Sequence, residues 1–167
     1  IFDTMQIYGI HPVEELLGAA PGNVTAVYYN KRETDRLQKV FERAGEAGIS
    51  CQSVPGHELD DMADGGNHQG VIAQTSGFEY ADLQDIVDAT AEADQAGVLV
   101  VDQVQDVGNL GAILRSAAGL GMDGVVIPKD RAAPVTPAVV RRSAGCAFRV
   151  PVARVTNISR TLETLKE

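Results

Sequence analysis

The 167-residue sequence contains no tryptophan, two cysteines and few aromatic residues, which make up 5% of the chain. Hydrophobic residues still account for 44% of it, so the chain can bury an aliphatic core in one ordinary domain or two small ones. No apolar run reaches about 18 residues, and therefore no segment is predicted to cross a membrane. Cys51 and Cys146 stand apart without a CxxC pattern, which is typical of free thiols in a reducing cytoplasm.

Histidine is also scarce, and its arrangement argues against a metal cofactor. The three histidines, His11, His57 and His68, show none of the spacings of zinc ligands. Nothing near the amino end has the basic-then-apolar layout of a signal peptide. Because the chain begins with Ile1 rather than methionine, residues 1–6 are interpreted as a tag or a disordered start.

Positive charge is missing from the middle of the chain. The formal net charge of −9 by itself argues against a nucleic-acid partner. However, residues 56–96 hold ten acidic residues and no lysine or arginine, whereas residues 97–167 hold nine basic residues against six acidic ones. Within 128–154 there are six basic residues and one acid, Asp130. The charge is therefore polarised, and the basic tract suits contact with an RNA backbone.

The patterns of residues 7–76 predict a compact α/β unit in which helices and strands alternate. Strands are predicted at 24–30, 49–54 and 70–76, and helices at 11–19, about 33–47 and 57–63. The acidic, alanine-rich segment 77–96 is interpreted as a linker rather than part of a core, with one weak helix as the alternative.

A second α/β unit is predicted at residues 97–167. Its expected elements are a strand at 97–102, a helix at about 109–120, a strand at 124–128, a helix opening at Thr136-Pro137, a short strand at 154–157 and a final helix from 158. Two firm strands and a possible third are too few for a well-covered parallel sheet. The second unit therefore looks unfinished.

The segment VGNLGAILRSAAGLG, residues 107–121, carries a single arginine on an otherwise uncharged helix. Asn109 stands where an N-cap is expected, and the free N–H groups of a helix start favour an anion. Gly111 precedes Arg115 by one turn, which would leave bare backbone beside the guanidinium. Because a guanidinium offers five donors in a fixed fork, Arg115 is a candidate for holding a phosphodiester.

Two alternatives fit the same segment. In the first, Gly111 permits close helix packing while Arg115 pairs with a nearby acid such as Asp106. In the second, the GNLG spacing is half of a dinucleotide-binding fingerprint. That alternative is the weaker one, because GxGxxG is not met and Pro128-Lys129 stands where an NAD site needs an acid.

These residues resemble the opening of the SpoU (TrmH-type) RNA ribose methyltransferases. The first motif of that family has the form N-x-G-x-x-x-R, which Asn109, Gly111 and Arg115 match. The phrases VIPKDR and VPVARVTN are similar to the branch that methylates a guanosine ribose in bacterial large-subunit rRNA. YGIHPV (8–13) and NHQGVIA (67–73) resemble the family's amino-terminal substrate-binding domain, whose fold is similar to small ribosomal proteins that bind bent RNA.

The resemblance implies an RNA substrate-binding domain at 7–76 and the first half of a knotted SPOUT methyltransferase domain at 97–167. Such enzymes transfer a methyl group from S-adenosylmethionine to a ribose 2′-hydroxyl, in this branch on a guanosine of 23S rRNA. The motifs that form the donor pocket lie beyond the end of this sequence, so no cofactor-binding residue is assigned and the chain alone is expected to be inactive. A homodimer is expected for the full-length enzyme. A non-catalytic RNA-binding module and a tRNA ribose methyltransferase remain alternatives.

The resemblance also implies roles for individual residues. Arg115 matches the family's proposed catalytic arginine, and we interpret it as a clamp on the target's phosphate that stabilises the developing alkoxide, because a permanently protonated guanidinium is a poor base. Asn109 either orients the ribose or only caps the helix. The candidate RNA contacts are Arg32, Arg36, His68, Gln69, Lys129, Arg131, Arg141 and Arg142. Solvated helix faces, and a strand-entry hydrogen bond at His68-Gln69, are the alternatives for these contacts.

Overall fold

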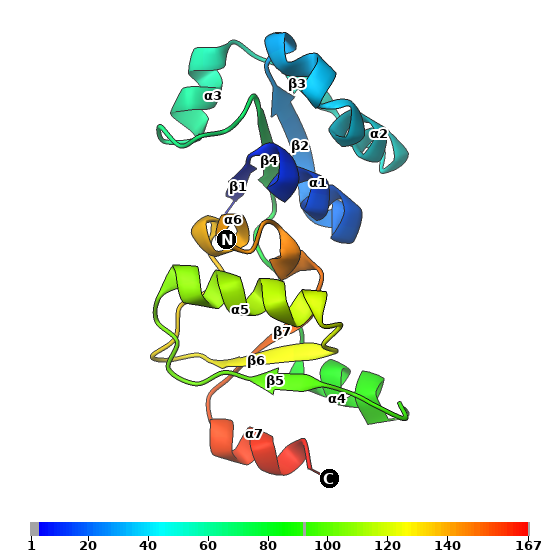
Figure 1. Cartoon of the computed structure of the whole chain (residues 1–167), viewed down its shortest axis with the longest axis vertical. Helices are drawn as coiled ribbons and strands as arrows, with labels where there is room; N and C mark the ends of the chain where they lie inside the picture. Colours follow the sequence, from blue (N-terminus) through cyan, green and yellow to red (C-terminus); the bar gives the residue numbers. More distant parts are fainter. Residues whose placement is uncertain (1–3, 92, 167) are drawn as a thin grey trace.

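The computed structural model describes residues 4–91 and 93–166, which form two sheets flanked by helices (Figure 1). The strands are β1 (Met5–Tyr8), β2 (Val24–Tyr29), β3 (Cys51–Ser53), β4 (Val71–Thr75), β5 (Val98–Val100), β6 (Gly124–Pro128) and β7 (Val152–Val155). The helices are α1 (Ile10–Ala19), α2 (Gln38–Glu46), α3 (Gly56–Met62), α4 (Leu83–Ala91), α5 (Val107–Gly119), α6 (Pro137–Arg142) and α7 (Ile158–Thr164). Short 3₁₀ helices are η1 (Pro21–Asn23), η2 (Lys31–Arg36) and η3 (Cys146–Phe148). The predicted α/β class is confirmed.

The first sheet has the strand order β1-β4-β2-β3, in which only β2 and β3 run parallel. The central strand β4 is buried on both faces because it alternates between two cores. Val71 and Ala73 pack in the core that contains α1 and α2, whereas Ile72 packs with Leu59 of α3. This arrangement explains why the three consecutive apolar residues Val71, Ile72 and Ala73 are all buried.

Two details of the first unit differ from the sequence predictions. Met5 and Gln6 belong to β1 and pair with Thr75 and Gln74, so they are not part of a disordered start. Residues 1–3 lie outside the described residues. The helix predicted at 33–47 is also shorter, since the 3₁₀ helix η2 precedes α2 and no side chain caps α2 at its start.

The second sheet is parallel, with the order β5-β6-β7, so a third strand is present, although it lies two residues earlier than the predicted 154–157. Helix α5 covers the face that looks toward the first unit, and α4 lies on the opposite face (Figure 1). Strand β6 alternates accordingly: Val125 and Ile127 join the core with α5, and Val126 joins the core with Ile86 of α4.

The acidic segment 77–96 connects the sheets, but it also contains the helix α4, which was the alternative for this segment, and it packs on the second sheet. Ala81 forms a parallel bridge with Ala153 of β7. Ile86 of α4 is 2% exposed and lies against Gly124, where a Cβ atom would approach its Cγ2 to 2.6 Å. The sequence conceals this packing because one buried isoleucine is surrounded by acidic residues that face water.

One hydrophobic core spans both units, with α6 between them (Figure 1). Val139 and Val140 of α6 are completely buried. Backbone N–H of Val135 donates to the hydroxyl of Tyr80 at 2.8 Å, which ties the chain before α6 to the connecting segment. The relative placement of the two sheets is therefore fixed by packing as well as by the covalent connection.

Candidate functional site

The helix start that carries the candidate site is capped by Asp106. Its Oδ1 accepts a hydrogen bond from the backbone N–H of Asn109 at 2.7 Å, and α5 begins at Val107. The interpretation of Asn109 as the N-cap is therefore wrong. Asn109 lies in the first turn with an exposed side chain. A carboxylate is favoured at the N-cap because it meets both the free N–H groups and the positive end of the helix dipole.

Replacing Asp106 with alanine should lower the free energy of unfolding by about 1 kcal/mol, because the cap is lost. Chemical denaturation measures this difference. Asp106→Asn is the matched control, since asparagine caps helices nearly as well and should retain most of the stability. Equal losses in both variants would show that the side-chain cap is not what stabilises this helix start.

Gly111 does not leave open backbone beside Arg115, because the end of α6 covers it. A Cβ atom at Gly111 would lie 2.5 Å from Cβ of Arg142 and 3.1 Å from the backbone N of Ser143. Gly111 is buried, and the close helix packing weighed as an alternative is what the structure contains at this position. The same alternative paired Arg115 with a nearby acid such as Asp106, and Arg115 makes no such ion pair among the described residues.

Two arginines are consequently brought to the same region from different helices. Arg142 lies against Gly111, and Arg115 follows Gly111 by one turn of α5. Both side chains are exposed, and neither makes a hydrogen bond or ion pair with another residue in the described part of the chain. An exposed guanidinium without a protein partner keeps all five donors available for an anion.

Lys129 and Arg131 follow β6 at the edge of the sheet where α5 also starts. Since β5 and β6 are parallel, their carboxyl ends meet at this edge. Both side chains are exposed. Arg154 holds the backbone beneath them, because its Nη2 donates to the carbonyl oxygen of Lys129 at 2.9 Å.

Arg141 is placed differently from the other candidates of the basic tract. Its guanidinium carbon lies 4.1 Å from the centre of the Tyr8 ring, and the side chain is half-buried. This cation–π contact joins α6 to β1 of the first unit. The structure thus gives Arg141 a contact between the two units.

Four candidates lie in the first unit, and two of them share a cavity. Arg36 and Gln69 line a cavity of about 440 Å³ together with His11 and Lys39. The backbone N–H of Ile10 donates to Oε1 of Gln69 at 2.9 Å, which fixes the start of α1.

Arg32 and His68 do not line that cavity. Arg32 is exposed in η2. His68 Nδ1 accepts from the N–H of Gly70 at 3.0 Å, and its Nε2 lies 3.0 Å from Oδ1 of Asp60. The hydrogen bond at the strand entry is present, and contact of His68 with RNA stays a prediction.

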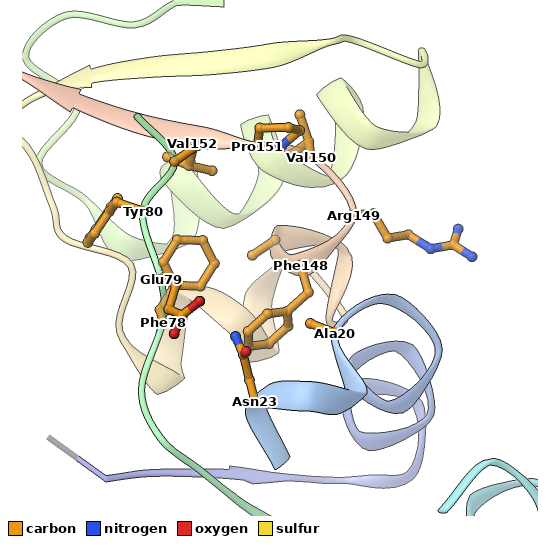
Figure 2. Close-up of a pocket in the computed structure, with 12 residues that line it drawn as sticks. Ala20, Asn23, Phe78, Glu79, Tyr80, Phe148, Arg149, Val150, Pro151 and Val152 are labelled. Atoms are coloured by element: carbon orange, nitrogen blue, oxygen red, sulfur yellow. The ribbon is translucent and has the colours of Figure 1, made fainter. Parts of the chain in front are cut away.

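Sequence reasoning missed a cavity of about 450 Å³ between the two units (Figure 2). It is lined by three aromatic side chains, Phe78, Tyr80 and Phe148, and by the polar residues Asn23 and Glu79. The available signal was the phrase FEY at 78–80, two aromatic residues inside an acidic segment of a chain with few aromatics. Phe148, the ring partner of Phe78, lies 70 residues further along the chain, and only the fold brings them together.

The described residues contain neither a cluster of metal ligands nor a helix that could span a membrane. Over 4–91 and 93–166, no three histidine, cysteine or acidic side chains are grouped so that they could hold a metal ion. None of the helices in this part is both long and apolar enough for a bilayer. Burial raises the pKa of the Cys51 thiol, which keeps it protonated and unreactive at neutral pH.

The two units match two protein-family models. Residues 6–81 match the RNA 2′-O ribose methyltransferase substrate-binding domain, and residues 96–167 match the SpoU rRNA methylase family. The chain is 41% identical over 162 residues to the 23S rRNA (guanosine-2′-O-)-methyltransferase RlmB of Vibrio cholerae, covering 96% of this chain and 66% of that protein. It is 47% identical over 133 residues to a putative TrmH family tRNA/rRNA methyltransferase, YacO, of Bacillus subtilis, covering 79% of this chain and 53% of that protein. The chain thus spans between about half and two thirds of these relatives.

Solved structures show the same fold at lower identity. An AdoMet-bound rRNA methyltransferase from Sinorhizobium meliloti superposes with a TM-score of 0.74 and 22% identity, covering 97% of this chain and 59% of that one. The SpoU methyltransferase AviRb from Streptomyces viridochromogenes, in complex with AdoMet, gives a TM-score of 0.71 and 24% identity, covering 98% and 58%. At this identity the likeness concerns the fold.

Proposed function

Because this chain belongs to the SpoU family of RNA 2′-O-ribose methyltransferases, we propose that its protein methylates the ribose 2′-hydroxyl of a guanosine in 23S rRNA. The methyl donor in this proposal is S-adenosylmethionine, as in the AdoMet-bound structural neighbours. Because the proposed substrate is ribosomal RNA, we expect the protein to act in the cytoplasm. We also expect the full-length protein to be a homodimer.

One observation carries the proposal at the level of chemistry. Arg115 presents an exposed guanidinium that has no partner among the described residues, on a helix whose start is fixed by Asp106, and α6 places Arg142 beside the same helix. Two such groups are suited to grip the phosphates on either side of a ribose. Arg115 then stabilises the negative charge that develops on the 2′-oxygen as its proton leaves to phosphate or water. Asn109, exposed in the first turn, is assigned to orienting the ribose.

We assign no donor-binding residue at the carboxyl edge of the second sheet. The loops that follow β5 and β6 bond to each other, since the N–H of Ala133 donates to the carbonyl oxygen of Val104 at 2.8 Å. The N–H of Lys129 likewise donates to the carbonyl oxygen of Val155 at 2.8 Å. These main-chain groups are engaged, so no described residue is assigned to the donor.

The RNA backbone contacts in this proposal fall on both units. Lys129 and Arg131 lie at the edge where α5 starts, and Arg36 and Gln69 line a cavity of the first unit. Arg32 is exposed in η2, the 3₁₀ helix that also carries Arg36, and is assigned to RNA contact as well. His68 is assigned to supporting its loop, because both of its ring nitrogens face protein partners, and Arg141 to joining the units through its contact with the Tyr8 ring.

The test is methyl transfer by the full-length protein from labelled donor to unmodified 23S rRNA, 16S rRNA and bulk tRNA in parallel. Label should enter 23S rRNA and be released by digestion as 2′-O-methylguanosine. Label confined to tRNA would make the protein a tRNA ribose methyltransferase. Binding of 23S rRNA without any transfer would make it a non-catalytic RNA-binding module. Both outcomes contradict the proposal.

A further inference from the structure

The cavity between the two units has the composition of a site for a flat ring. Phe78 and Phe148 lie with ring centres 5.5 Å apart and planes tilted by 47°, and Tyr80 meets Phe78 edge-on at 5.2 Å. All three rings are half-buried, so part of each remains open to the cavity. Stacking on such rings is how proteins hold unpaired bases of RNA, since every base has a π-face.

Two polar side chains beside these rings have no partner in the part of the chain that the structure describes. Neither the amide of Asn23 nor the carboxylate of Glu79 makes a hydrogen bond or ion pair within the described residues. In Figure 2 the Asn23 side chain rises toward the Phe148 ring, whereas Arg149 is directed away from the other lining residues. Arg149 pairs with Glu15 at 2.7 Å on that outer side.

A carboxylate next to a stacking platform favours one base above the others. A carboxylate only accepts hydrogen bonds, and its two oxygens can receive two parallel N–H groups. Guanine presents such a pair on its Watson–Crick edge, N1–H and the N2 amino group. Adenine, cytosine and uracil each present an acceptor beside the donor on that edge. One oxygen of the Glu79 carboxylate would therefore face an acceptor oxygen or nitrogen, which is unfavourable.

The cavity also joins the two parts of the chain that match different family models. Asn23, Phe78 and Glu79 lie within residues 6–81, whereas Phe148 lies within residues 96–167. No residue of α5 lines it. A base held here would therefore belong to a nucleotide other than the one gripped by Arg115, and it would contact both units at once.

We propose that this cavity binds an unpaired guanine of the substrate RNA, outside the target nucleotide, by stacking on Phe78 and Phe148 and by hydrogen bonds to Glu79 and Asn23. This inference rests on the proposed RNA substrate. It adds a specificity contact at the junction of the two units.

The experiment measures binding of fluorescein-labelled single-stranded RNA by fluorescence anisotropy. The probes are a uridine heptamer and the same heptamer with a central guanosine, adenosine or inosine. The wild-type protein should prefer the guanosine probe over the adenosine probe by about tenfold, the size expected for a paired hydrogen-bond contact to one base. Inosine, which lacks the N2 amino group, should fall between them.

Glu79→Gln should remove the preference for guanosine and leave the affinity for the uridine heptamer unchanged. Its matched control is Glu58→Gln, which neutralises an exposed acid on α3 that does not line the cavity and should keep the preference. Phe148→Leu should weaken all probes through lost stacking; circular dichroism checks that it folds. Because Glu79 is exposed, its variant remains informative even if Phe148→Leu does not fold.

A wild-type protein without guanosine preference, or a Glu79→Gln variant that keeps it, overturns this site. Either result can occur together with normal methyl transfer to 23S rRNA, in which case only the cavity assignment fails. Guanosine preference that depends on Glu79 without methyl transfer supports the cavity and contradicts the proposed activity.

Discussion

Replacing Gly145 with alanine should lower the free energy of unfolding by about 2–4 kcal/mol, which corresponds to a fall in Tm of roughly 5–15 °C for a chain of this size. Gly145 has a φ of 85°, in the left-handed region that disfavours residues with a Cβ atom. A Cβ atom there would also lie 2.5 Å from Cβ of Glu15 and 3.0 Å from the carbonyl oxygen of Pro12. The chain after α6 would have to move away from α1.

The control for this experiment is Gly121→Ala. Gly121 has a similar φ of 69°, but a Cβ atom there would have no other atom within 4 Å. Its replacement should therefore reveal the backbone cost alone, about 1 kcal/mol. The difference between the two variants in thermal or chemical denaturation measures the contact between the two units. Equal losses would mean that close packing of α1 against this turn contributes nothing to stability.

Local features of the fold were predictable because a few neighbouring residues determine them. Thr136 followed by proline predicts a helix start, and the hydroxyl of Thr136 does accept from the N–H of Val139, at 3.4 Å. The strand predicted at 124–128 has those bounds as β6, because all five of its residues are buried. Such elements need only their own hydrophobic pattern and a cap.

Features that depend on distant partners were not predictable. The motif N-x-G-x-x-x-R places Gly111 beside Arg115, but the end of α6 that covers Gly111 comes about thirty residues later in the chain. Asn109 and Asp106 both suit an N-cap, and the choice depends on where the loop after β5 turns. The cavity at Phe78 and Phe148 likewise exists only once the two sheets are packed together.

Replacing Arg115 with alanine should lower the rate constant for methyl transfer by about 10²–10³-fold, the effect of removing one donor to a developing oxyanion. The fold should survive, because the side chain is exposed and makes no hydrogen bond or ion pair in the described part of the protein. Loss of one phosphate contact should also make the slope of log K for RNA binding against log salt concentration shallower by about one.

Arg160→Ala is the matched control for this loss. Arg160 is an exposed arginine of α7, so its replacement removes the same charge from a position outside the proposed site. Arg115→Lys separates charge from geometry, because lysine keeps the positive charge and lacks the bidentate fork. It should recover part of the RNA affinity and little of the transfer rate.

The most direct measurement is the single-turnover rate constant of full-length Arg115→Ala on unmodified 23S rRNA, at enzyme concentrations that saturate binding, divided by that of Arg160→Ala. If the Arg115 guanidinium stabilises the reacting ribose oxygen, this ratio of rate constants should be below about 10⁻². A ratio near one, with RNA binding intact in both variants, would contradict the assignment of this helix start as the reacting centre.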